Sequence, residues 1–311
     1  MRKVNWGSLA VILSRLDLRW AGLGFTSTAV LIASLALRWQ IFLRQQRIVL
    51  PFRTTFALTW AGQFFNSLLP GSTGGDVIKI LSVCRLAPDR KPAATSTVLV
   101  DRFTALVALA VLAGVALLTY PGPVMGLITD RISLRNSVIA VLAGGVLTGA
   151  VAIGLARFLR GSRIVDVIVR VATAMRANLV LSPKIAFAGI LAFEIHLWNF
   201  LTVFLYARAL GIPISFGEVL LMMPVILFIV LVPVTINGHG LRELLLIAYF
   251  TRMGMATQAA TANPQETAVA LSLLVVANDL LWSLPGGLFY LLRFSSRNEP
   301  GVGDSGRTIA I

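Results

Sequence analysis

The stretch GQFFNSLLPGSTGGD, residues 62–76, interrupts an otherwise uncharged helical segment that begins near Thr54. Proline removes a backbone donor and glycine weakens a helix, so the break leaves polar backbone groups without helical partners. Such backbone survives at membrane depth only where protein buries it or water lines it. A shorter apolar segment, residues 77–86, follows the break. Because each half is short for a full crossing, the sequence predicts a re-entrant hairpin over about residues 54–86, with two ordinary short spans as the alternative.

A second break of the same kind lies in the other half of the chain. The stretch VPVTINGHGLRE, residues 232–243, divides an apolar segment and predicts a second re-entrant unit over about residues 219–255. Each break contains a proline, two nearby glycines and then charged residues, and matching interruptions in two halves point to a transporter binding site. The residues expected to form the breaks are Pro70, Gly74, Gly75, Pro233, Gly238 and Gly240.

The composition of the whole chain places both units in a membrane. Of its 311 residues, 57% are hydrophobic and 13% are charged, and the mean hydropathy is +0.85. Soluble domains carry about 25% charged residues, so this chain has too little charge to cover a soluble surface. The expected fold is therefore an all-α polytopic integral membrane protein. Five segments have the length and composition to cross a bilayer: about residues 20–43, 97–120, 136–156, 185–210 and 267–292.

The remaining charges orient the helices. The chain has 27 Lys and Arg against 13 Asp and Glu, a net charge of +14. The basic clusters can all be cytoplasmic if the spans alternate and each hairpin returns to the side it left. The first hairpin then opens from the cytoplasm and the second from outside, as in an inverted-topology repeat, and residues 293–311 form a cytoplasmic tail. The cluster after the first span comprises Arg38, Arg44, Arg47 and Arg53.

The basic excess also bears on partners. In a membrane protein it indicates contact with anionic lipid head groups, and we expect no nucleic-acid partner. The loop 157–184 is strongly basic, its middle reads as an interfacial helix, and it could dock a separate soluble lipid-modifying enzyme. Association with a second copy stays open. With one cysteine, Cys84, and two histidines, the sequence predicts neither an internal disulfide nor a metal site, and no cofactor is expected.

Ionisable or polar residues inside apolar segments are costly, so each is a candidate for the site. Basic side chains suit a lipid phosphate, and carboxylates suit an amino or hydroxyl-rich head group. The helix start after Gly74 and Gly75 also offers backbone N–H groups for phosphate. The candidates for substrate binding are Asn66, Ser72, Asp76, Lys79, Asp101, Arg102, Glu194, Asn237, Arg242, Glu243 and Asp279.

Structural roles are the alternative for several of these candidates. The charges near the start of the second span could anchor it at the interface, and the others could link helices through ion pairs or hydrogen bonds. These roles concern the pairs Asp101 with Arg102, Arg242 with Glu243, Glu194 with His196, and Asn278 with Asp279.

The quoted stretches resemble the signatures of a known family. Residues 62–76, with Asp101 and Arg102 at the head of the next span, are similar to the first signature of the lysylphosphatidylglycerol synthase transmembrane-domain family. Residues 232–243 are similar to its second signature, a proline followed by G-x-G-x-R-E. The resemblance extends over about residues 17–292, although Lys79 stands where the family more often has arginine.

The resemblance implies a role in moving a lipid between the leaflets of the bacterial inner membrane. Two departures from the family are expected. A span that usually precedes the first one is missing, which would account for the basic residues near the N-terminus, and the soluble synthase domain has no counterpart after residue 292. The resemblance therefore implies lipid handling without synthase activity.

Three functions remain in view from the sequence. The first is a flippase or transporter for an anionic, aminoacylated or glycosylated lipid, which is the function we expect. The second is a polytopic transferase acting on a lipid phosphate, with Asp76 or Asp101 as base or metal ligand. The third is an accessory subunit that docks a separate synthase through residues 157–184.

Overall fold

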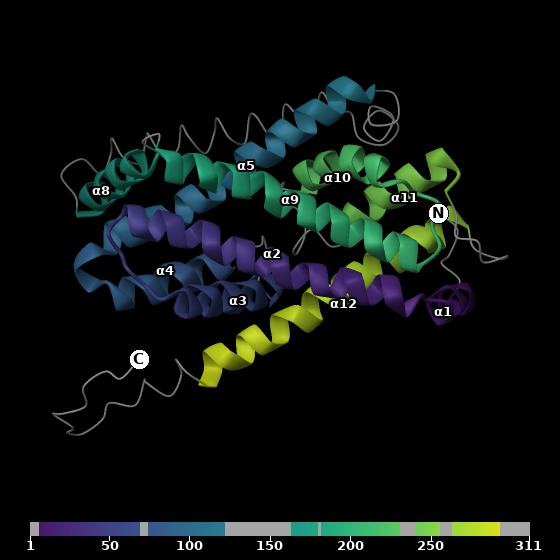
Figure 1. Cartoon of the computed structure of the whole chain (residues 1–311), viewed down its shortest axis with the longest axis horizontal. Helices are drawn as coiled ribbons and strands as arrows, with labels where there is room; N and C mark the ends of the chain where they lie inside the picture. The colour runs from purple at the N-terminus through teal and green to yellow at the C-terminus, as the bar shows by residue number, and fades with distance from the viewer. Residues whose placement is uncertain are drawn as a thin grey trace.

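The computed structural model describes residues 6–68, 74–121, 163–179, 182–230, 241–255 and 263–292. Within these ranges the secondary structure is entirely helical, as expected (Figure 1). The helices are α1 (Trp6–Ser14), α2 (Leu18–Gln45), α3 (Phe52–Leu68), α4 (Gly74–Leu86), α5 (Lys91–Thr119), α8 (Arg163–Asn178), α9 (Pro183–Ala209), α10 (Phe216–Val230), α11 (Leu241–Met253) and α12 (Pro264–Tyr290), with a short 3₁₀ turn at Pro88–Arg90.

Four helices, α2, α5, α9 and α12, are long and apolar enough to cross a membrane. Each has 27 to 29 residues, which corresponds to about 40 Å at 1.5 Å per residue and exceeds a hydrocarbon core of about 30 Å. They coincide with four of the five expected spans. The fifth, residues 136–156, lies outside the described residues. All four helices begin before the expected spans because polar residues form their first turns.

Side-chain caps fix where three of these helices begin. Asp17 accepts a hydrogen bond from the Arg19 backbone N–H at the start of α2, at 2.9 Å. Ser182 caps α9 in the same way. At α12, Asn263 and Glu266 form a reciprocal capping box. Each cap satisfies a backbone donor that the first helical turn leaves free.

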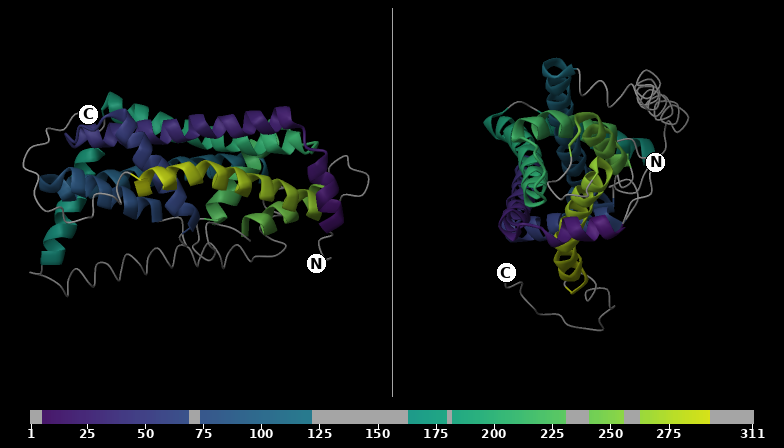
Figure 2. Two further views of the ribbon diagram at one scale, coloured as in Figure 1. Left: turned by 90° about the horizontal axis from the view of Figure 1, so that it is seen from below. Right: turned by 90° about the vertical axis from the view of Figure 1, so that its right-hand side faces the viewer.

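The two expected hairpin units lie toward opposite ends of the long axis of the molecule. Helices α3 and α4 pack together near the end where α2 finishes, and α10 and α11 lie near the end where α2 starts (Figures 1 and 2). The residues that join each pair, 69–73 and 231–240, lie outside the described residues. Pro70, Pro233, Gly238 and Gly240 are therefore not placed, whereas Gly74 and Gly75 open α4.

Backbone contact sets the position of the first hairpin. A Cβ on Gly75 would lie 2.2 Å from the carbonyl oxygen of Gly62, so α3 and α4 touch through their main chains. A Cβ on Gly286 would lie 2.4 Å from the carbonyl oxygen of Trp60, so α12 approaches α3 equally closely. Side chains larger than hydrogen at Gly75 and Gly286 are incompatible with this packing.

The largest apolar core holds the second hairpin in place. It joins α5, α9, α10, α11 and α12 and includes the fully buried side chains of Phe200, Met222 and Phe250. Apolar side chains also remain on the outside, among them Phe103, Ile190 and Leu281. An outer surface of this kind is compatible with surrounding lipid.

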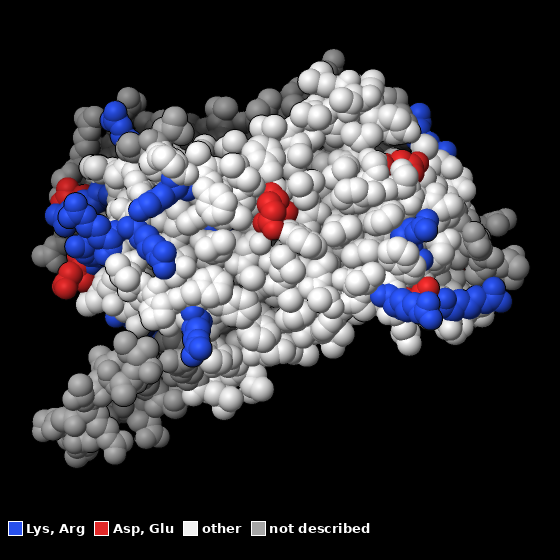
Figure 3. Space-filling model, viewed as in Figure 1, with Lys and Arg blue, Asp and Glu red and all other residues white. Residues whose placement is uncertain are grey.

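Charged residues on the visible surface gather at the two ends of the bundle, with a largely uncharged band between them (Figure 3). One end, formed by the C-terminal end of α2, the N-terminal ends of α5 and α9, and helix α8, is strongly basic (Figures 1 and 3). Helix α8 packs there against α5, and Asn178 donates to the Ser96 hydroxyl at 3.2 Å. The expected helix in loop 157–184 is thus confirmed over Arg163–Asn178.

Arg38 does not belong to the basic loop in which the sequence analysis placed it. It lies within α2 with a relative exposure of 2%, and its guanidinium faces the interior of the bundle. Its partner is Asp101 of α5, 63 residues further along the chain. The sequence around Arg38 does not indicate that pairing, and for this reason Arg38 was grouped with the arginines at the membrane boundary.

Candidate functional site

Two adjoining cavities lie between the helices. The larger, about 350 Å³, is lined by residues of α2, α3, α5, α9, α10 and α12. The smaller, about 160 Å³, lies among α2, α3, α4, α5 and α9. Gln63, Asn66 and Arg102 line both, so the cavities share a wall.

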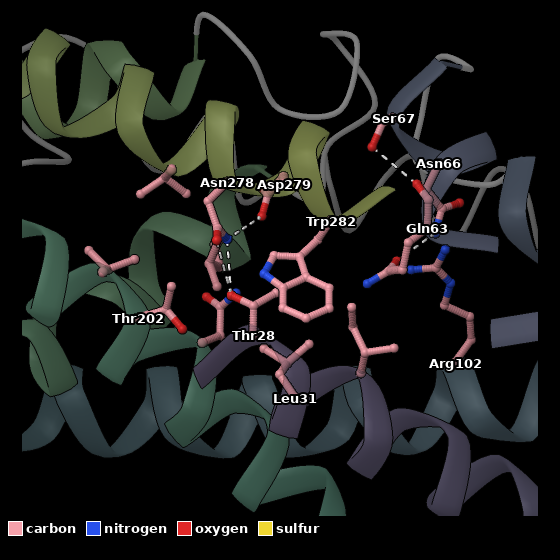
Figure 4. Close-up of a pocket in the computed structure, with 15 residues that line it drawn as sticks. Thr28, Leu31, Gln63, Asn66, Ser67, Arg102, Thr202, Asn278, Asp279 and Trp282 are labelled. Atoms are coloured by element: carbon pink, nitrogen blue, oxygen red, sulfur yellow. Dashed lines mark hydrogen bonds between the residues drawn. The ribbon is translucent and has the colours of Figure 1, made fainter. Parts of the chain in front are cut away.

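The larger cavity has opposite charges on its two sides (Figure 4). Arg102 lies on one side, next to Gln63 and Asn66. Asp279 lies on the other side, and the Trp282 ring stands between them (Figure 4). The cavity can therefore receive a polar group that carries a negative charge at one end and a positive charge or hydroxyl groups at the other.

A buried hydrogen-bond network holds the Asp279 side of the cavity. Asn278, 3% exposed, donates to the Thr28 hydroxyl at 3.0 Å and accepts from the Tyr206 hydroxyl at 2.9 Å. The hydroxyls of Ser27 and Thr202 form a second hydrogen bond, of 2.7 Å, and Thr202 lies one helical turn before Tyr206 on α9. These contacts join α2, α9 and α12. Asn278 therefore links helices by hydrogen bonds, which is the structural role that the sequence left open for it.

Replacing Asn278 with alanine is expected to destabilise the protein by about 1–2 kcal/mol, the range found for hydrogen bonds between membrane helices. The free energy of unfolding in detergent micelles would measure this loss. The matched control is Ser283→Ala on the same helix, because among the described residues that buried hydroxyl bonds within α12, to Leu280 O. An equal effect from both substitutions would show that the network does not join the helices.

The smaller cavity is lined by a chain of buried charges. Arg38 Nε donates to Asp101 Oδ1 at 2.8 Å, and Lys79 Nζ lies 4.0 Å from Asp101 Oδ2. The Lys79 ammonium also lies over the Trp39 ring, 4.8 Å from its centre. Buried charges persist only where they are paired and hydrogen-bonded. Asp101 is consequently not an anchor pointing to water, as the alternative interpretation held, but the centre of an interior cluster.

The first hairpin contributes the wall between the cavities. Arg102 Nε forms an ion pair with Asp76 Oδ2 at 2.5 Å, which links α5 to the first turn of α4. Asn66 Oδ1 accepts a hydrogen bond from the Gly75 N–H at 2.7 Å. The N–H of Gly75, expected to be open to phosphate, is therefore already bonded. A carboxylate in the first turn of α4 also interacts favourably with the helix dipole.

Glu194 and His196 each link α9 to another helix by a hydrogen bond, as the structural alternative for the pair held, but to two different helices. Glu194 Oε1 accepts from the Ser34 hydroxyl of α2 at 3.1 Å and from Trp198 Nε1. His196 Nε2 donates to the carbonyl oxygen of Ala105 on α5, at 3.0 Å. Residues two apart point to different sides of a helix, so the pair contacts different neighbours. His196 lines the smaller cavity, and Glu194 lines neither.

The second hairpin carries its own polar cluster. Arg242 Nη2 lies 3.7 Å from Glu243 Oε1, and the Ser272 hydroxyl of α12 donates to the same carboxylate. Neither charged residue lines either cavity. Their contacts agree with the alternative of an ion pair that ties α11 to a neighbouring helix. Two further candidates, Ser72 and Asn237, lie outside the described residues.

Of the predicted site residues, Asn66, Asp76, Lys79, Asp101, Arg102 and Asp279 line the cavities. Sequence reasoning found Asn66 but missed the other uncharged polar residues, because polar but uncharged side chains in an apolar segment attract little notice. A count of amides within the apolar segments, spans and hairpin units alike, would have found Gln63 and Asn199. Arg38 carries a clearer signal, since it interrupts the expected first span between the uncharged residues 21–37 and 39–43.

Comparison with known families agrees with this architecture. The sequence matches the family described as Lysylphosphatidylglycerol synthase TM region over residues 1–263 of 311. The chain belongs to this family. The match begins earlier and ends earlier than the resemblance seen in the signatures, so α12, with Asp279, follows the matched residues. No curated protein matches the sequence. Family membership links the chain to a membrane and to lipid handling.

Proposed function

We propose that the chain moves a lipid with an anionic, aminoacylated or glycosylated head group between the leaflets of a bacterial inner membrane. The observation that carries the proposal is the larger cavity, which places Arg102 and Asp279 on opposite sides inside a bundle of membrane-length helices. A guanidinium suits a lipid phosphate, and a carboxylate suits an ammonium or hydroxyl groups on the head. The proposed role is transport and involves no chemical step.

The arrangement of the hairpins supports this role. We interpret α3–α4 and α10–α11 as re-entrant pairs that enter from opposite faces, related as an inverted repeat. Such repeats place the substrate near the bilayer midplane, where the two halves meet. The strongly basic end would be cytoplasmic by the positive-inside rule, together with the C-terminal end of α12 (Figures 1 and 3).

Reconstitution in liposomes tests the proposal directly. We expect the purified protein to accelerate leaflet exchange of a labelled lipid from one of the three head-group classes. The variant Asp279→Asn should slow the exchange of an aminoacylated lipid more than that of phosphatidylglycerol, because it removes the partner for the ammonium. Glu218→Gln is the control, since Glu218 is half-buried in the first turn of α10, accepts hydrogen bonds from Ser215 and does not line the cavity. Exchange no faster than in protein-free liposomes for every head group would refute the proposal.

An accessory role is the second candidate, and the surface of α8 favours it. This helix exposes Arg170 and Arg176 together with Ile168 and Val169. A surface that is both basic and apolar suits an acidic protein partner as well as lipid head groups. A soluble lipid-modifying enzyme that co-purifies with the chain, and is lost when Arg170 and Arg176 become glutamine, would support this role.

A further inference from the structure

The smaller cavity contains two polar atoms that have no hydrogen-bond partner among the described residues. They are Arg38 Nη1 and Thr59 Oγ1. Both residues are 2% exposed, and both line the cavity. An unpaired buried donor is expensive, more so when it is charged, and native structures rarely leave one unsatisfied. Two such atoms, on residues that line the same cavity, indicate a ligand that accepts hydrogen bonds.

The charges around the cavity define what that ligand carries. Three cationic side chains line it, from Arg38, Lys79 and Arg102, against two carboxylates. Those carboxylates, Asp76 and Asp101, are already engaged in the ion pairs described above. The lining therefore carries one more positive than negative charge. His196 is left out of this count, and its Nε2 donates to the carbonyl oxygen of Ala105. An anion with several acceptor oxygens would balance the excess charge.

The size of the cavity also fits an oxyanion. Its volume of about 160 Å³ equals that of about five water molecules at ~30 Å³ each. A phosphate group has five non-hydrogen atoms. Gln63, Asn66 and Arg102 border both cavities, so a phosphate in the smaller cavity would lie next to a head group in the larger one.

We propose that the smaller cavity is a binding subsite for a phosphate group, with Arg38 Nη1 and Thr59 Oγ1 as its donors. This inference rests on the proposed transport function, because it takes the phosphate to be part of the transported lipid's head group. Arg102, placed between the cavities, would contact the phosphate from the side of the head group. The same chemistry admits free inorganic phosphate, which the experiment separates.

Binding measured without transport tests the subsite. The protein in neutral detergent would be titrated with inorganic phosphate and, separately, with short-chain phosphatidylglycerol, and calorimetry would give the Kd of each. We expect saturable binding of phosphatidylglycerol by the wild type. Arg38→Lys keeps the charge but removes the free donor, and should weaken binding ten- to a hundredfold, the range expected for a charge-assisted hydrogen bond.

Thr59→Val separates a ligand contact from a structural role. It removes an unpaired hydroxyl at nearly constant volume, so the unfolding temperature of the empty protein should stay the same or rise. Phosphatidylglycerol binding should nevertheless weaken several-fold. Thr55→Val is the matched control, because Thr55 is buried one turn earlier on α3 but does not line the cavity. It should leave the Kd unchanged.

The outcomes distinguish this inference from the transport proposal. Undiminished phosphatidylglycerol binding in both Arg38→Lys and Thr59→Val would overturn the subsite and show that only water satisfies these atoms, even if lipid exchange proceeds normally. Binding of inorganic phosphate alone would confirm the anion site and reject the lipid as its source. Binding of phosphatidylglycerol that requires Arg38 and Thr59, in a protein without exchange activity, would retain the subsite and reject transport.

Discussion

Replacing Arg102 with glutamine is expected to slow lipid exchange in liposomes by ten- to a hundredfold or more. Arg102 lines both cavities and is the cation closest to their shared wall. A charge-assisted hydrogen bond to a phosphate contributes about 1.5–3 kcal/mol, which corresponds to this factor for a single contact. The substitution also leaves Asp76 without its ion-pair partner at 2.5 Å, so a negative charge would face the incoming phosphate. Initial rates with labelled phosphatidylglycerol would measure the effect.

Two variants control this prediction. Arg85→Gln removes an exposed arginine from α4 of the same hairpin and should leave exchange unchanged. Arg102→Lys keeps the charge but loses the planar fork of donors, so exchange should fall to an intermediate rate. A wild-type rate for Arg102→Gln, in protein with a normal unfolding temperature, would show that Arg102 does not contact the lipid. A low unfolding temperature instead would assign it a structural role.

The membrane helices could be predicted because their signal is local. A run of about 20 apolar residues has few alternatives, so α2, α5, α9 and α12 were all expected within a few residues of their ends. All four begin before the expected spans because each helix extends into the polar boundary as far as its first turn. Asn263 and Glu266, which begin α12, show this directly. The fold class therefore follows from composition and periodicity.

The partners of the polar residues could not be predicted in the same way. Arg38 and Asp101 are 63 residues apart in sequence, and Asn278 and Thr28 are 250 apart. Which pairs meet depends on helix rotation and on which helices are neighbours, and a single sequence specifies neither. Glu194 and His196 show the reverse, because residues adjacent in sequence reach different helices. The candidate list therefore included Asn66, Asp76 and Lys79 of the first hairpin but omitted Gln63 and Thr59 of the same hairpin.

Replacing Gly75 with alanine is expected to prevent the first hairpin from closing. The new Cβ would lie 2.2 Å from Gly62 O and 2.9 Å from Asn66 Cγ. The closest neighbour is backbone, which cannot swing aside, so α4 must move away from α3. We expect a loss of stability at or above the upper end of the ~1–3 kcal/mol range for overpacking. Unfolding in detergent and the yield of folded protein would both report it.

Gly114→Ala is the matched control, because Gly114 lies inside α5 and a Cβ there meets no atom within 4 Å. Alanine is the better helix former, so this variant should be unchanged or more stable by up to about 1 kcal/mol. Movement of α4 would also break the bond from Gly75 N–H to Asn66 and carry Asp76 away from Arg102. Gly75→Ala protein that still folds should therefore exchange lipid slowly, whereas Gly114→Ala should exchange it at the wild-type rate. Equal stability and exchange in the two variants would mean that contact between α3 and α4 does not hold the wall between the cavities.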